Sequence, residues 1–489
     1  MKWFGRERVK LYILFLLVIT SFIQVGILWY YQNRGVPTNF LWGFFNKSQA
    51  ETEYDIGDAF KPYRVVVSEG FENPHWVIKE NHEYYKPLWN DAQAYIKYLL
   101  TDRGVVSKGE YGKEFWGDVV LRKSFIFEFK TCINSELLAA FLNERWVSGF
   151  KSEGIYKMAI LPSENINKNL TIYVFDGDKV NKYVVPFVTK GLSIDDYDDI
   201  IANLYEDDIE GYSVIKEYVT NYVYQYLSPD VLIVAQGRKY RNYKNLVCNV
   251  PELIRNIQQP NSSQDLNDIA RIILGEDEDD YIRSIDVYNK TVVFQNLSNM
   301  YRIYRDGLLE YKYLHGINSY EKGSKVEALK IALEFINRRE KLVSGVDVYL
   351  SGIEEHSNYY TFSFDYKFND MEVSFNEYTV NNKDKNKLNH AITVDVNSQR
   401  ILSCYWALKE FKLGKENLML NVKFESLFDD IFNLYQDISI KDFSVKDINM
   451  TYEVKFSTDS QSLEPVWIVE TMEGKRYVVP MQKKPPEEG

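Results

Sequence analysis

The chain has 489 residues and a formal net charge of −12, from 58 Lys and Arg against 70 Asp and Glu. Its hydrophobic fraction of 45% and charged fraction of 26% are those of folded proteins, which excludes a chain that is disordered throughout. With 25 Gly and 13 Pro it is not collagen-like, and its acidic balance argues against nucleic acid as a partner.

The first 31 residues predict a basic cytoplasmic tail (1–10) and a transmembrane helix (11–31). The tail contains four basic residues and one acid, and residues 11–31 contain no charged side chain. A helix of that length spans about 30 Å, the thickness of the hydrocarbon core of a bilayer. Trp29, Tyr30 and Tyr31 are typical of an interfacial aromatic belt. The positive-inside rule then places the bulk of the chain outside the cytoplasm.

We interpret residues 11–31 as an uncleaved anchor, because the apolar run is long for a signal peptide and no A-x-A-like site precedes the aromatic residues. No second apolar run of this kind follows, so a single-pass protein of the cell membrane is expected. Residues 1–34 carry five basic side chains and one acidic one, which leaves −16 on the rest. Anionic lipid headgroups should repel such a surface. Residues 32–60 are predicted to form a juxtamembrane stalk.

Three residues of the anchor are candidates for contact with another membrane helix. Ser21, Gln24 and Gly26 are small or polar, although the anchor has no GxxxG motif. Residues of these types are also tolerated facing lipid. Both interpretations of Ser21, Gln24 and Gly26 stay open.

Residues 61–190 are predicted to form an N-terminal α+β domain. Its first strand, KPYRVVVSEG at 61–70, is followed by a turn, and Asp176-Gly177-Asp178 is typical of a hairpin turn. Ser135 is the expected N-cap of the second helix. The expected helices are 87–100 and 135–145, and the expected strands are 118–130, 156–161, 170–175 and 179–188.

Residues 191–315 are predicted to form a central α+β domain. Its acidic clusters at 195–199 and 206–210 lack the spacing of a calcium-binding EF-hand loop, so we interpret them as solvated surface. Gly275 is the expected C-terminal cap of a helix. The expected elements are a strand at 230–236, a helix at 265–274 and strands at 284–288, 291–296, 300–304 and 308–313.

Residues 316–489 are predicted to form a C-terminal α+β domain in which a helix followed by antiparallel strands occurs twice. The first helix, 325–339, is strongly amphipathic, and the second is expected at 424–435. The expected strands are 346–353, 359–368, 391–396, 401–408, 443–456, 465–470 and 475–479.

The sequence contains no motif of a known catalytic, nucleotide-binding or metal site. G-x-S-x-G, H-E-x-x-H, Walker A and G-x-G-x-x-G are absent. The three cysteines, Cys132, Cys248 and Cys404, fit no zinc or redox spacing and are interpreted as core residues. His75 and His82 give only a weak metal signal. We therefore predict no catalytic residue, no cofactor and no metal, and a protein that is not an enzyme.

Three segments of the chain carry a resemblance to a known family: KPYRVVVSEG at 61–70, VVFQNLSNMYRIYRDGLLEY at 292–311 and PVWIVETMEGKRYVVP at 465–480. They resemble the YycH family of membrane-anchored regulators, encoded with the WalK/WalR two-component system of Gram-positive bacteria. The closing segment is similar to the hairpin shared by YycH-like and YycI-like domains. The order of a short basic start, one membrane span and a large ectodomain is also similar to that family.

The resemblance implies an α+β fold: a single N-terminal transmembrane helix followed by tandem extracytoplasmic domains of antiparallel sheets with packed helices. It also implies a non-enzymatic protein that associates with a WalK-like sensor histidine kinase and a YycI-like protein. Such a protein would modulate signalling that controls cell-wall metabolism.

Two other hypotheses stay open. One is an extracytoplasmic module that binds cell-wall polymer or a peptide without a kinase partner, for example by strand addition at an exposed sheet edge. The other is an envelope hydrolase, which would need converging carboxylates with perturbed pKa values.

Overall fold

The computed structural model describes residues 60–485 with internal gaps. The predicted tail, the anchor at 11–31 and residues 32–59 of the stalk lie outside the described residues. Among the helices that are described, none combines the length and the apolar character needed to cross a bilayer. The gaps are 102–103, 145–149, 151, 164–168, 207–208, 210, 216–227, 229, 235–238, 257–262, 276–279, 287–290, 317–321, 377, 382–383, 424–426, 436–443 and 457–459.

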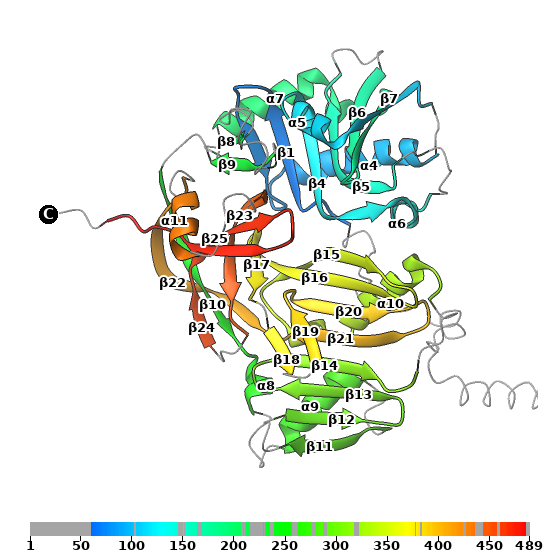
Figure 1. Cartoon of the computed structure of the whole chain (residues 1–489), viewed down its shortest axis with the longest axis vertical. Helices are drawn as coiled ribbons and strands as arrows, with labels where there is room; N and C mark the ends of the chain where they lie inside the picture. The colour runs from blue at the N-terminus through cyan, green and yellow to red at the C-terminus, as the bar shows by residue number, and fades with distance from the viewer. Residues whose placement is uncertain are drawn as a thin grey trace, which may run out of the picture.

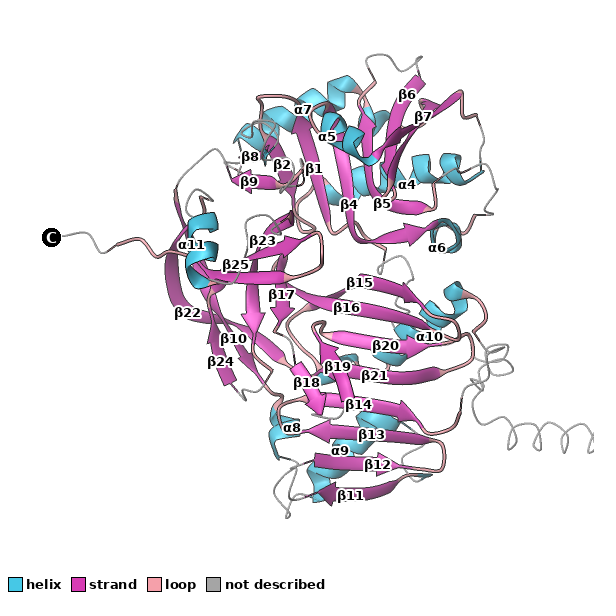
Figure 2. Cartoon of the chain, in the orientation of Figure 1, coloured by secondary structure: helices cyan, strands magenta, loops and turns pink. Residues whose placement is uncertain are grey.

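Two large sheets dominate the described part of the chain, and helices are few (Figures 1 and 2). The first sheet has nine described strands, and every pairing in it is antiparallel. Their order is β3 (Ser107–Gly112), β7 (Lys179–Pro186), β6 (Asn169–Phe175), β5 (Gly154–Leu161), β4 (Lys123–Asn134), β1 (Arg64–Glu69), β2 (His75–Ile78), β8 (Gly211–Val214) and β9 (Leu232–Val234).

Helices cover both faces of this first sheet. Helices α4 (Tyr85–Thr101), α6 (Ser135–Phe141) and α7 (Ile194–Glu206) pack with alternate residues of β1 and β4 on one face. The short helix α5 (Trp116–Val119) packs with the intervening residues on the other face. Both faces are therefore apolar, which explains why RVVVSE of β1 is a nearly continuous apolar run rather than an alternating one.

The second sheet has twelve strands within the described residues. In order they are β11 (Ile282–Asp286), β12 (Thr291–Gln295), β13 (Asn299–Tyr304), β14 (Leu308–Tyr313), β21 (Ile401–Ala407), β20 (Ile392–Val396), β16 (Tyr360–Phe368), β17 (Met371–Phe375), β23 (Val445–Val454), β25 (Pro465–Thr471) and β26 (Arg476–Pro480), with β15 (Asp347–Glu355) paired to β16. The pairing of β17 with β23 is parallel. The prediction of antiparallel sheets is therefore wrong for this one pair of strands.

Helices α9 (Ser263–Leu274) and α10 (Lys325–Asn337) lie on one face of the second sheet, as Figure 1 shows. Helix α11 (Leu427–Leu434) packs with β9, β23, β25 and β26 in a separate apolar cluster. The remaining elements are helix α8 (Glu252–Asn256), a sheet of β22 (Glu410–Asn421), β10 (Tyr240–Asn249) and β24 (Ser460–Leu463), and a hairpin of β18 (Tyr378–Asn381) and β19 (Asp384–Leu388).

The sheets do not follow the order of the chain. Strands β8 and β9, which follow residue 190, complete the first sheet, and β14 pairs with β21 across residue 315. Strand β10 pairs with the distant strands β22 and β24. The boundaries at 190 and 315 remain predictions, and hydrogen-bonded sheets continue across both.

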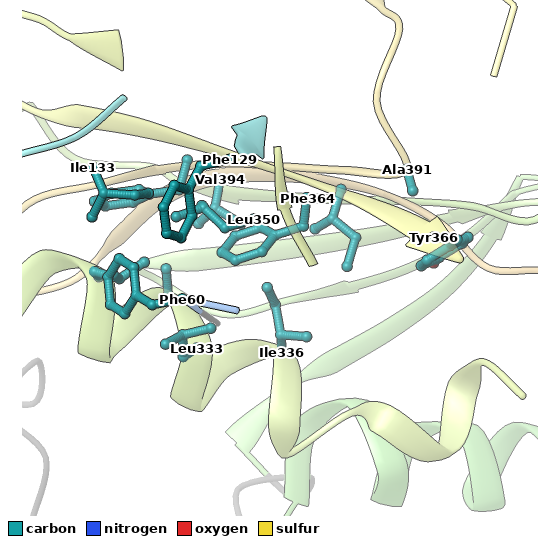
Figure 3. Packing of buried hydrophobic residues seen from close by; sticks show 14 of the residues in the cluster. Phe60, Phe129, Ile133, Leu333, Ile336, Leu350, Phe364, Tyr366, Ala391 and Val394 are labelled. Atoms are coloured by element: carbon teal, nitrogen blue, oxygen red, sulfur yellow. The ribbon is translucent and has the colours of Figure 1, made fainter. Parts of the chain in front are cut away.

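The two large sheets share one apolar core where they meet. Strand β4 lies against β15, and Phe129 and Ile133 of β4 belong to the same buried cluster as Leu350 of β15 and Leu333 of α10 (Figure 3). Phe60, just before β1, is 1% exposed in this cluster. The first described residue of the chain is therefore buried between the two sheets.

Within residues 61–190, the sequence predicted one hairpin turn correctly and the start of one helix and one strand incorrectly. The β6–β7 hairpin turns at Asp176-Gly177-Asp178 as expected, with Gly177 at φ 108°. The N-cap of α6 is Asn134, whose side chain accepts from the Leu137 N–H at 3.0 Å, so the prediction of Ser135 was wrong by one residue. The strand predicted from residue 118 begins at Lys123, because Trp116 and Val119 form a helical turn that covers the sheet.

Candidate functional site: a charged junction between the two large sheets

A cluster of charged side chains fills the junction beside the shared apolar core. We call it the junction cluster, and it has four cationic, four anionic and one phenolic member. These are Tyr63, Arg64, Glu128, Lys130, Lys157, Asp230, Lys367, Glu372 and Asp447.

The second sheet contributes the polar face of β16, β17 and β23. In β16 the side chains alternate, so Lys367 lies on the face opposite Phe364 and Tyr366, and all nine residues of the strand are buried. Lys367 is directly opposite Glu372 in β17, and Glu372 is opposite Thr451 in β23. At Lys367 and Glu372 this buried polar face is contacted by Tyr63 and Lys130 of the first sheet.

The first sheet contributes β1, β4 and the segment before β1. The Lys130 ammonium lies 2.9 Å from Glu372 Oε2, and the Tyr63 hydroxyl donates to the same oxygen at 3.0 Å. The Arg64 guanidinium pairs with Glu128 within its own sheet and lies 3.7 Å from Asp447 Oδ1 across the junction. Charged contacts therefore connect β1 and β4 to β17 and β23.

Lys157 of β5 extends the cluster toward β9. It pairs with Asp230 and lies 3.5 Å from Glu128 Oε1. Asp230 is also bonded by the Trp116 indole N–H at 3.0 Å and by the Ser228 hydroxyl. These hydrogen bonds satisfy a carboxylate that is only 5% exposed.

Lys367 differs from the other cations, since among the described residues no carboxylate lies within salt-bridge distance of its ammonium. Its ammonium donates to the Tyr63 carbonyl at 2.9 Å and lies 4.7 Å from the Tyr63 ring centroid and 5.2 Å from that of Tyr349. A carbonyl and two aromatic faces replace part of its hydration. Burial lowers the pKa of Lys367 below its ordinary value.

The ionised state of the other members follows from their neighbours. Burial acts to raise the pKa of Asp447, but Arg64 and Lys130 lower it to about 2. Burial also opposes ionisation of Glu372, yet Lys130 holds its pKa below the ordinary value. Asp447 and Glu372 are therefore charged at neutral pH, and their contacts with Arg64 and Lys130 across the junction are ionic.

A Ser, His and Asp group lies beside the junction, but its geometry is not that of a catalytic triad. His390 Nδ1 is 2.8 Å from Asp365 Oδ2 and 3.3 Å from Ser351 Oγ. A triad places the carboxylate at Nδ1 and the nucleophile at Nε2, whereas both contacts here converge on Nδ1. Asp365 raises the pKa of His390 against the opposing effect of burial. The group fixes the start of β20, because Asp365 also accepts from the Ala391 N–H at 2.9 Å.

The residues considered for metal or redox chemistry lie apart. His75 is buried in β2 with Nε2 3.0 Å from the Val120 carbonyl, and the His82 ring packs against Tyr84. Cys132, Cys248 and Cys404 are all free thiols. Within the described ranges, no group of three or more His, Cys, Asp or Glu is arranged to hold a metal ion.

The sequence-predicted contact face and the junction cluster are different parts of the chain. Ser21, Gln24 and Gly26 lie outside the described residues and remain a prediction. The junction residues were missed, because single Lys and Glu residues in strands are usually exposed. The sequence of β16, YTFSFDYKF, alternates and so predicts a polar face. It does not predict that residues of another sheet contact this face.

Comparison with known proteins gives a structural match. No family model and no curated protein matches the chain. The crystal structure of YycH from Bacillus subtilis matches with a TM-score of 0.56, covering 86% of this chain and 96% of that chain at 14% identity. The chain has a YycH-like fold. At this identity the match shows the fold and not the role of any residue.

A second solved structure also aligns, with a lower score. It is an uncharacterized protein from Eubacterium rectale, with a TM-score of 0.28 and 12% identity, covering 60% of this chain and 99% of that chain. A TM-score that low does not establish a shared fold.

Proposed function

We propose that the chain is a non-enzymatic regulator that is anchored in the cell membrane and modulates a WalK-like sensor histidine kinase. In this proposal a YycI-like protein is a further partner, the bulk of the chain is extracytoplasmic, and the signalling controls cell-wall metabolism. The observation that carries it is the likeness to YycH over 96% of that chain. The apolar run at 11–31 supplies the anchor.

The charged junction supports a regulatory role. Contacts between parts of one chain that are polar, like those of transient protein interfaces, favour relative movement of the parts. The junction cluster provides such contacts between two otherwise well-packed sheets. A regulator needs two states of similar free energy, and movement at the ionic contacts would have to keep the apolar core that the two sheets share closed.

Crosslinking in native membranes tests the proposal. The full-length chain is compared with one whose residues 11–31 are replaced by an unrelated span, and with a variant in which Ser21, Gln24 and Gly26 are all leucine. Recovery of a sensor histidine kinase with the native chain supports the proposal. Loss with both altered chains places the contact at those three residues, and equal recovery places it in the exported part. Absence of any kinase in all three samples contradicts the proposal.

A second candidate function is binding of an extended peptide without a kinase partner, and one observation favours it. Among the described strands β11 is the last of the second sheet, and all five of its residues are exposed. A free edge accepts another strand through main-chain hydrogen bonds. Peptides selected by phage display on the native chain should then lose binding when Ser284 is replaced by proline. Unchanged binding would exclude this edge as the site.

A further inference from the structure

The five residues that precede and begin β1 contact both large sheets. We call residues 60–64 the strap. Phe60 is buried, its ring centroid 5.5 Å from that of Phe141 in α6, and Figure 3 shows it beside Leu333 of α10. Helix α6 belongs to the first sheet and α10 to the second. The first residue of the strap thus packs between helices of both.

The next two residues are fixed to the first sheet. The Lys61 ammonium lies 2.8 Å from Glu80 Oε1, just after β2. The Pro62 carbonyl accepts from the Tyr85 hydroxyl at 2.6 Å, at the start of α4. Pro62 is itself buried, so this part of the strap is held by a hydrogen bond that water does not reach easily.

Tyr63 is held mainly by the second sheet. Its carbonyl accepts from Lys367 and its hydroxyl donates to Glu372, so β16 and β17 each bind one end of the residue. The Lys130 ammonium lies 4.1 Å from its ring centroid. Arg64 then pairs with Glu128 on the first sheet and approaches Asp447 on the second.

We infer that the strap couples the N-terminal part of the chain to the junction cluster, so that displacement at residue 60 loosens the contact between the two sheets. Phe60 cannot leave its site without exposing an apolar ring, and Tyr63 cannot move without breaking its contacts with Lys367 and Glu372. A change in the predicted stalk therefore reaches β16 and β17 through the chain itself. The inference rests on the proposed function only where it predicts an effect on kinase signalling.

Hydrogen exchange of the full-length chain in nanodiscs tests the coupling. Tyr63→Phe removes the hydroxyl that bonds Glu372 and keeps the ring. The expected result is exchange about 10- to 100-fold faster in the peptide covering residues 360–375, as for loss of one partly buried hydrogen bond to a charged group. Phe60→Ala should produce the same acceleration from the other end of the strap.

Tyr304→Phe is the matched control. The Tyr304 hydroxyl donates to Glu310 Oε2 at 2.8 Å, so the same kind of bond is lost, but both residues lie on adjacent strands of the second sheet. This variant should leave exchange in 360–375 unchanged. Equal exchange in wild type and Tyr63→Phe, or equal acceleration by Tyr63→Phe and Tyr304→Phe, overturns the inference.

Kinase recovery in the same nanodisc preparations separates the two proposals. Accelerated exchange without any bound kinase would support the strap and contradict the proposed function. A recovered kinase whose autophosphorylation is unchanged by Tyr63→Phe, together with unaltered exchange, would contradict the strap and leave the regulator proposal standing.

Discussion

Asp447 shows how much a single junction carboxylate contributes to folding. Its pKa lies at about 2 in the folded chain against an ordinary value of 3.8. A carboxyl with a depressed pKa stabilises the fold above its unfolded pKa, and this contribution is lost as the pH falls through the folded value. Asp447→Asn should therefore lower the free energy of unfolding by on the order of 2 kcal/mol at pH 7.

Urea unfolding at pH 7 and at successive values from 4 to 2 measures this effect. The difference between wild type and Asp447→Asn should shrink over the acid range. Asp178→Asn, which changes an exposed carboxylate in the β6–β7 turn, should have little effect at any pH. A constant difference between wild type and Asp447→Asn across the acid range would contradict the assigned pKa.

Lys367 should have the opposite influence on stability. Because burial depresses its pKa, the folded state binds fewer protons than the unfolded state just below the ordinary value of 10.5. Its burial therefore opposes folding at neutral pH, and this cost fades as the pH rises toward 10.5. Relative to Lys367→Met, wild type should gain stability between pH 7 and pH 10, as measured by urea unfolding. The control Lys86→Met replaces an exposed lysine on α4 and should show no such trend. If the free energies of unfolding of wild type and Lys367→Met differ by the same amount at pH 7 and pH 10, the pKa of Lys367 is not depressed.

At the scale of residues, the sequence predicted what local chemistry decides. Gly177 and Gly275 have the positive φ values that a hairpin turn and a helix end require. The α6 cap was misplaced by one residue, because Asn134 and Ser135 are both good caps and only the helix start decides between them. The junction cluster could not be predicted, since the partners of Tyr63 and Arg64 lie more than 300 residues away, at Glu372 and Asp447.

At the scale of elements, strong periodicity was predictive and weak periodicity was not. Helix α10 lies within the predicted 325–339, because its apolar stripe faces the second sheet. Strands β10 and β22 were not predicted. Much of β22 is exposed and carries Lys and Glu, so it has no alternation that would distinguish it from a loop.

We expect the protein to self-associate through strand β11. Ile282 is 77% exposed and Ile285 is 43% exposed on this strand, which is the last of the second sheet among the described residues. Exposed apolar edge strands pair with other chains, and a lysine on the edge prevents this. Ile282→Lys should therefore reduce light scattering by the concentrated protein, with stability changed by less than about 0.5 kcal/mol.

The matched control for this edge is Met472→Lys. Met472 is 55% exposed and lies in the β25–β26 turn, so the substitution adds the same charge away from any free edge. If both variants lower scattering equally, net charge and not the β11 edge controls self-association.

At the scale of the whole molecule, charge predicts how the exported part behaves near a membrane. The chain after residue 34 has a formal net charge of −16. A protein that begins at residue 35 should bind vesicles containing phosphatidylglycerol no better than vesicles of phosphatidylcholine at low ionic strength. Co-sedimentation measures this. Preferential binding to the anionic vesicles would reveal a basic surface that the overall charge conceals.

The α+β class was evident from the sequence, but the sheet order was not. Each predicted domain contained helices and strands in plausible order, and the YycH-like fold agrees with that class. Pairings such as β17 with β23 depend on packing between segments about 80 residues apart, which local patterns do not encode.

The position of β10 has a consequence for the timing of synthesis. Its Asn245 accepts a hydrogen bond from the Glu416 N–H, 171 residues further along the chain. At ~5–20 residues per second, roughly 10–30 s separate the appearance of the two partners. The nine strands of the first sheet all precede residue 235 and can pair in that interval, while β10 waits without its neighbours. A holding chaperone would therefore act most usefully on β10 while residues 250–410 are being synthesised.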